Sequence, residues 1–130
     1  MKKVPAIYQF LVLLSVLSAV QAALADTAAD LKQAQGLYDS GRYAQAEALY
    51  KRIVTDNPRT EAALDAKRGL AMLYAKTGED ALLAQTCESL TTDFGGHKDM
   101  PSILGQIADE CRNANRHSVA VPIYQYVVDH

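Results

Sequence analysis

Residues 37–58 read LYDSGRYAQAEALYKRIVTDNP and contain a complete turn between two helical patterns. Apolar residues recur every three or four positions on both sides of Gly41, which is the spacing of one helix face. Glycine tolerates the left-handed backbone conformation that ends many helices, so Gly41 predicts a sharp turn. Asn57-Pro58 cannot continue the second helix, because proline lacks an N–H and restricts the residue before it. The segment therefore predicts a helical hairpin.

The same turn returns twice further along the chain. Gly78 and Asn115 follow Gly41 at two successive intervals of 37 residues, and each has apolar residues at helical spacing on both sides. A fixed period of this length is typical of stacked helical repeats. We therefore predict an all-α chain with six helices, over about residues 27–40, 43–56, 61–77, 80–93, 100–114 and 117–129.

Residues between the hairpins support these bounds. Thr60 is predicted to cap the third helix, with Glu61 favourable in its first turn. Gly95-Gly96 ends the fourth helix, and Pro101 suits the start of the fifth. Each hairpin has apolar residues on more faces than it can bury alone, so we expect neighbouring hairpins to stack. The alternative is one compact bundle whose periodicity is accidental.

The first 25 residues have the order of a secretory signal peptide. Lys2 and Lys3 come first, an almost wholly apolar run follows over residues 7–20, and Ala23-Leu24-Ala25 places small residues before a cut. We predict that residues 1–25 are a signal peptide and that the chain is periplasmic or secreted from a bacterial cell. An uncleaved membrane anchor is the alternative, although a spanning helix needs about 20 apolar residues.

The composition of residues 26–130 excludes one class of partner. Loss of Lys2 and Lys3 from the 13 basic residues leaves 11 against 15 acidic ones, a formal charge of about −4. Nucleic-acid binding requires a basic surface, so we expect no nucleic-acid partner. No later segment is apolar enough to span a bilayer, so we expect no stable membrane insertion after cleavage.

The hairpins resemble tetratricopeptide repeats, which carry small, aromatic, glycine and proline residues at set offsets. The matching residues are Ala34, Gly41, Tyr43, Ala46, Tyr50 and Pro58 in the first repeat, Ala71, Tyr74 and Gly78 in the second, and Ala108, Ala120 and Tyr124 in the third. The early tryptophan of the family is absent, and the period is 37 instead of 34 residues. The longer period resembles that of bacterial periplasmic repeat proteins related to the outer-membrane assembly lipoprotein and the Tol–Pal-associated coordinator protein.

This resemblance implies a right-handed α-α superhelix of three helix-turn-helix repeats, over about residues 27–59, 60–96 and 97–130. It also implies that the first helices of the repeats line a concave groove that binds a protein or a peptide. The implied groove residues are Gln35, Tyr38, Asp39, Arg68, Met72, Lys76, Asp109, Arg112 and Asn113. The alternative is that these side chains form only a solvated helix face.

The remaining reactive residues do not predict catalysis. Cys87 and Cys111 are an even pair in a chain expected in an oxidising compartment, so a disulfide between them is one prediction and two buried thiols are the other. The histidines lack the spacing of metal ligands, and the sequence has no phosphate-binding loop or nucleophile motif. We therefore expect no enzyme activity, no metal and no cofactor.

The sequence leaves two functions open. The first is an envelope scaffold that mediates protein–protein interaction through its groove. The second is the amino-terminal repeat region of a longer exported protein with an enzymatic or cell-wall-binding domain downstream. Ile123, Val127 and Val128 leave an apolar edge at the last helix. This edge predicts that the chain continues, or that the edge docks on a partner or on a second copy of the chain.

Overall fold

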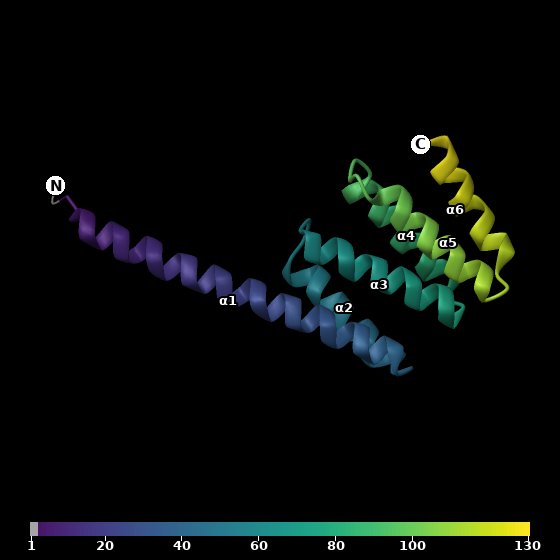
Figure 1. Ribbon diagram of the computed structural model, residues 1–130, viewed down its shortest axis with the longest axis horizontal. Coiled ribbons are helices and arrows are strands. Elements are labelled where there is room, and N and C mark those ends of the chain that lie inside the picture. Colours follow the sequence, from purple (N-terminus) through teal and green to yellow (C-terminus); the bar gives the residue numbers. More distant parts are fainter. Residues whose placement is uncertain (1–2) are drawn as a thin grey trace.

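The computed structural model describes residues 3–130, and Figure 1 shows that its regular structure is α-helical. The helices are α1 (Ala6–Asp39), α2 (Tyr43–Asp56), α3 (Glu61–Thr77), α4 (Asp80–Phe94), α5 (Met100–Asn113) and α6 (His117–Asp129). The predicted all-α class is confirmed, and helices α2 to α6 begin and end within one residue of their predicted bounds.

The predicted turns have the expected backbone conformations. Gly41 and Gly78 have φ angles of 77° and 85°, and Asn115 has a φ of 59°, so all three adopt the left-handed conformation. The Thr60 hydroxyl accepts a hydrogen bond from the backbone N–H of Ala63 at 3.2 Å, which makes Thr60 the cap of α3. These local signals account for the accuracy of the helix bounds.

The start of α1 differs from the prediction. We expected the first helix to begin near residue 27, but α1 begins at Ala6 and continues without a break into the first hairpin. No proline or glycine lies between Pro5 and Gly36, and the good helix formers alanine and leucine are frequent there. Nothing local therefore stops the helix. Residues 3–26 are all exposed, and Figure 1 shows this part of α1 as a rod that leaves the bundle.

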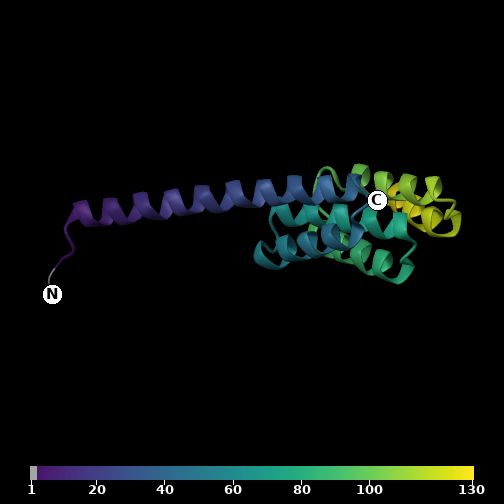
Figure 2. The same cartoon turned by 90° about the horizontal axis from the view of Figure 1, so that it is seen from below.

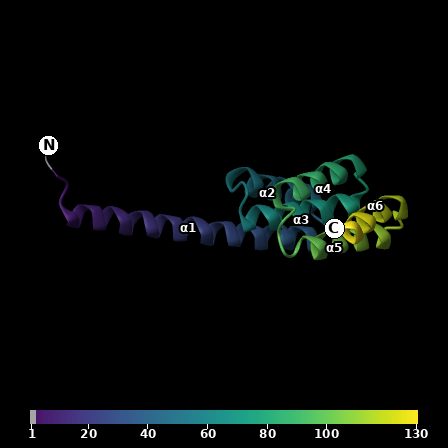
Figure 3. The same cartoon turned by 90° about the horizontal axis from the view of Figure 1, so that it is seen from above.

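The helices pack in sequence order, with α3 at the centre. α1 contacts α2 and α3, α3 contacts α4 and α5, and α5 contacts α6, whereas α4 has few contacts with α5. Figures 2 and 3 show α2 and α4 on one side of α3 and α1 and α5 on the other. The first helices of the three hairpins therefore share one side of the bundle.

Two tyrosines join the first hairpin to the second. Tyr50 of α2 is only 2% exposed, and its ring lies so close to Gly69 of α3 that a Cβ atom there would be 2.4 Å from the ring. The Tyr74 hydroxyl of α3 donates to Glu47 of α2 at 2.8 Å. Both tyrosines are buried and thus fill the space between the first two hairpins.

The third hairpin joins the second mainly through α3 and the turns. Lys76 of α3 and Glu110 of α5 form an ion pair at 3.6 Å. Arg116, at the turn before α6, pairs with Asp80 at the start of α4, and its guanidinium lies against Gly78. Tyr124 instead donates to Asp109 within its own hairpin. The second junction therefore lacks an aromatic ring like that of Tyr50.

The close approach of Tyr50 makes Gly69 a critical residue. Gly69→Ala should lower the free energy of unfolding by about 1–3 kcal/mol, because the added methyl group must displace a buried ring. Urea unfolding followed by circular dichroism measures this change.

Gly105→Ala is the matched control, because Gly105 is also within a helix but has no neighbour within 4 Å of an added Cβ atom. That change should leave stability equal or raise it by up to about 1 kcal/mol, since alanine favours helix more than glycine does. Equal effects of the two substitutions would contradict the Tyr50–Gly69 contact.

Candidate functional site

A hollow of about 190 Å³ lies among α1, α2, α3 and α5, and we call it the Arg68 hollow. Its lining residues are Gln35, Tyr38, Tyr50, Asp65, Arg68, Gly69, Met72 and Gln106. Because helices from all three hairpins contribute to the lining, the hollow depends on the way the hairpins are stacked. Its lining combines aromatic rings, a thioether, two carboxamides and one guanidinium.

The Arg68 hollow contains part of the predicted groove. Four of the nine predicted residues line it, namely Gln35, Tyr38, Arg68 and Met72. Asp39 is its neighbour, because the Gln35 amide donates to the Asp39 carboxylate at 2.8 Å. The structure therefore brings together the predicted residues of α1 with Arg68 and Met72 of α3.

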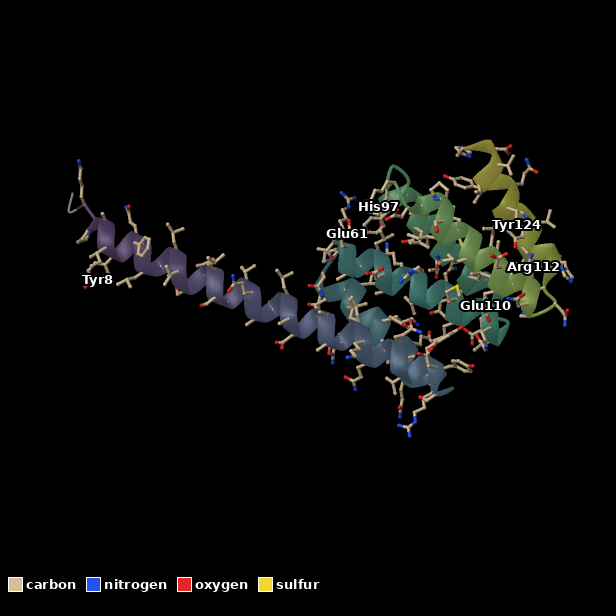
Figure 4. The ribbon with its side chains drawn as sticks, viewed as in Figure 1. Tyr8, Glu61, His97, Glu110, Arg112 and Tyr124 are labelled. Carbon is tan, nitrogen blue, oxygen red and sulfur yellow. The ribbon has the colours of Figure 1, made fainter. Side chains whose placement is uncertain are left out.

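The predicted residues of α5 lie elsewhere. Asp109 accepts the hydrogen bond of Tyr124 from α6 and pairs with Arg112 at 3.3 Å, while Asn113 is exposed at the end of the helix. In Figure 4, Glu110 lies on the part of α5 toward α3, and Arg112 and Tyr124 lie beyond it toward α6. Gln106 is the α5 residue that reaches the hollow instead.

Sequence analysis also missed Tyr50, Asp65 and Gly69 as lining residues. Tyr50 lies on a second helix, which the resemblance assigns to the other face, but its long side chain crosses to the hollow over Gly69. Asp65 is three residues before Arg68 and therefore shares its helix face. Helical spacing would have found Asp65, whereas the Tyr50 position depends on packing.

The hollow contains two accessible charges, the Arg68 guanidinium and the Asp65 carboxylate. The partner of Arg68 is Asp65 at 3.4 Å, and both side chains are well exposed. Such a pair on one exposed helix face contributes little to stability, so a competing anion can replace Asp65 at small cost. The Tyr50 hydroxyl donates to the Gln35 carbonyl at 3.4 Å, which is a long and weak contact.

Tyr38 keeps its proton at every physiological pH. Burial, followed by the nearby Glu110 carboxylate, raises the pKa of Tyr38 to about 12. Its ring contacts Tyr43 edge-on, with centroids 5.7 Å apart. Tyr38 therefore offers an aromatic surface and a neutral hydroxyl to the hollow, and it has no property of a catalytic base.

Two further grooves occupy equivalent places on the other side of the molecule. The Lys67 groove is lined by Val54, Lys67, Leu70, Gln85, Thr86 and Ser89. The Leu104 groove, of about 280 Å³, is lined by Cys87, Glu88, Thr91, Leu104, Pro122, Ile123 and Tyr126. Five residues of the first correspond to five of the second at a separation of 37 positions, so each groove lies at one junction between hairpins.

The two grooves have opposite chemistry. Lys67 is only 8% exposed, and its ammonium group donates to Ser89 at 2.5 Å and to Asp93 at 2.6 Å, which ties α3 to α4. Leu104 takes the equivalent place at the second junction, and Tyr126 takes the place of Ser89. The Leu104 groove is therefore mainly apolar, whereas the Lys67 groove contains the ammonium group of an ion pair within the second hairpin.

Cys87 and Cys111 are both free cysteines, with Cys111 buried and Cys87 half-buried. Burial, and then the neighbouring Cys111, raise the pKa of the Cys87 thiol to about 11. Both thiols are thus protonated and weakly nucleophilic at neutral pH. Cys87 lies on α4 and Cys111 on α5, and the disulfide between them stays a prediction.

The histidine, cysteine and carboxylate side chains of residues 3–130 do not form a metal-binding cluster. Over that range, no three side chains of His, Cys, Asp or Glu converge on a point that could hold a metal ion. His97 contacts Glu61 at 3.1 Å and accepts the backbone N–H of Asp99, as Figure 4 shows for the first pair. This histidine ties the loop before α5 to the start of α3, which is a structural task.

Comparisons with known proteins do not assign the chain to a family. No protein-family model, no curated protein and no solved structure matches it. The resemblance to tetratricopeptide repeats is therefore still a prediction, and it depends on the residues and spacings named above.

The Lys67–Asp93 tie should make stability depend on acid. The hydrogen bond and charge of Lys67 lower the pKa of Asp93, so this pair stabilises the folded state above the ordinary carboxyl pKa and is lost as pH falls through the lowered value. Lys67→Met should therefore flatten the loss of unfolding free energy between about pH 5 and 2. Urea unfolding at a series of pH values measures the free energy of unfolding of both proteins. Parallel dependences on pH for the two proteins would argue against a stabilising Lys67–Asp93 pair.

Proposed function

We propose that this chain is an exported, non-enzymatic scaffold protein that binds a protein or peptide in the Arg68 hollow. The main support is the position of the Arg68 guanidinium, which lies in a hollow lined by all three hairpins and is held only by an exposed carboxylate. The aromatic and thioether groups of Tyr38, Tyr50 and Met72 supply apolar contact around it. This combination suits an extended or helical peptide that carries an acidic group.

We also propose that the three hairpins are tetratricopeptide-like repeats in a right-handed superhelix. The left-handed turns at Gly41, Gly78 and Asn115, each 37 residues after the last, support this proposal. The correspondence between the Lys67 and Leu104 grooves, also at 37 residues, supports it independently. In such an array the side shared by α1, α3 and α5 is the binding face.

The amino-terminal part of α1 supports export. α1 is the one helix among residues 3–130 that is long and apolar enough to cross a membrane, and both signal sequences and membrane anchors have this property. No charged residue lies between Lys3 and Asp26. We favour a signal peptide cut after Ala25, because small residues precede that bond and because residues 3–26 are all exposed.

The alternative function is the repeat region of a longer exported protein with an enzymatic or cell-wall-binding domain downstream. In that case the hairpins would position the second domain or drive its assembly. The reading frame beyond His130 distinguishes the two functions, and so does cell-wall binding by the complete gene product.

Binding in the hollow should depend on Arg68 and not on Arg112. Peptides selected by phage display against residues 26–130 should lose at least tenfold in affinity with Arg68→Glu, because the substitution reverses the charge that faces the peptide. Arg112→Glu is the matched control, since Arg112 is an exposed arginine outside the hollow that also pairs with an aspartate three residues before it. Isothermal titration calorimetry measures the peptide affinity of each variant. Equal affinities of the two variants would exclude the hollow as the binding site.

The exposed edge of α6 should govern any self-association. Val121 and Val128 are 63% and 79% exposed, whereas Ile123 and Val127 pack against the core. Val128→Glu should therefore convert an associated form of residues 26–130 into a monomer without a change in helicity. Sedimentation equilibrium over a concentration series measures the molar mass in solution. An unsubstituted chain that is monomeric at every concentration would contradict self-association through α6.

A further inference from the structure

We propose that Thr27 becomes the N-cap of α1 when residues 1–25 are removed, so that α1 contains a second helix start that only the processed chain uses. The inference builds on the proposed export signal.

In the unprocessed chain Thr27 is an interior helix residue. Its hydroxyl donates back to the carbonyl of Ala23 at 2.9 Å. A β-branched residue with such a bond is slightly unfavourable inside a helix. Residues 3–26 are exposed, and Thr27 is the first of residues 3–130 with intermediate burial, so the packed part of α1 begins at this point.

Removal of the signal segment creates a new helix end. A peptidase adds water across the Ala25–Asp26 bond and leaves a carboxyl group on Ala25 and an amine on Asp26. The released segment takes the carbonyl groups of residues 22–25 with it. In an α-helix these carbonyls accept the N–H groups of residues 26–29, so four donors at the new end lose their partners.

The residues at the new end can satisfy these donors. Thr27-Ala28-Ala29-Asp30 has the spacing of a capping box, in which the threonine hydroxyl accepts the N–H three residues later and the acidic side chain accepts the N–H of the threonine. Asp30 is already held at this place, because its Oδ2 atom pairs with Arg52 of α2 at 2.7 Å. Its negative charge also favours a helix amino terminus.

If Thr27 caps the helix, Thr27→Ala should shift the melting temperature in opposite directions in the processed and the unprocessed chain. In residues 26–130, Thr27→Ala should lower the melting temperature by about 5 °C, because it removes the cap. In residues 1–130, the same substitution should leave the melting temperature equal or raise it, because alanine is the better interior helix residue. Thr27→Ser should restore the processed form, since serine caps as well as threonine.

Both forms are measured in the same dodecyl maltoside solution, by near-ultraviolet circular dichroism of the tyrosines during heating. The shorter chain keeps every packed residue, because residues 3–26 are all exposed. Thr55→Ala is the matched control: Thr55 is exposed in α2 and its hydroxyl donates back to Lys51 at 3.0 Å, so its effect should be the same in both forms.

A shift of equal sign in the two forms for Thr27→Ala, or no loss in the shorter chain, would overturn the capping role. The mass of the chain recovered from the cell envelope tests the export signal separately. A recovered chain that retains residues 1–25 would contradict the proposed cleavage, while the melting comparison would still decide whether Thr27 can cap the helix.

Discussion

Burial of α3 is the constraint on which the rest of the structure depends. Nine of its 17 residues are buried, and they face α1, α2, α4 and α5, so this one helix contacts four others. A helix that is apolar on several faces is unstable alone in water and must be surrounded. The small residues Ala66, Gly69 and Ala71 let its neighbours approach closely, and this sets where the Arg68 hollow opens.

The two junctions on either side of α3 differ in strength, and the difference has a physical cause. The first has the Tyr50 ring against Gly69, whereas the second has Cys87 and Gln106 at the equivalent places. The second is instead crossed by two ion pairs, Lys76–Glu110 and Arg116–Asp80. The second junction is the less extensively packed of the two, and less packing means lower local stability. We therefore expect the third hairpin to be the part of the bundle that separates most easily from the rest.

The surfaces that remain divide the molecule by chemistry. The hollow beside α1, α3 and α5 combines aromatic contact with an accessible guanidinium, which suits selective recognition of an acidic peptide. The edge of α6 and the Leu104 groove are apolar and almost uncharged, which suits association with another apolar surface. The exposed rod of α1 is largely apolar. Helices of this length and composition occur as membrane anchors and as signal sequences.

The sequence by itself determined the helices and their ends, because left-handed turns at Gly41, Gly78 and Asn115 and the Thr60 cap act over a few residues. The predicted start of the first helix was wrong, because α1 begins at Ala6. No helix-breaking residue separates the exposed segment from the packed part of the helix. Only the tertiary structure decided which side chains meet: it brought Tyr50 and Gln106 into the hollow and turned Asp109 and Arg112 away from it. Helical periodicity defines the face on which a residue lies, but the neighbour that it contacts depends on how the hairpins pack.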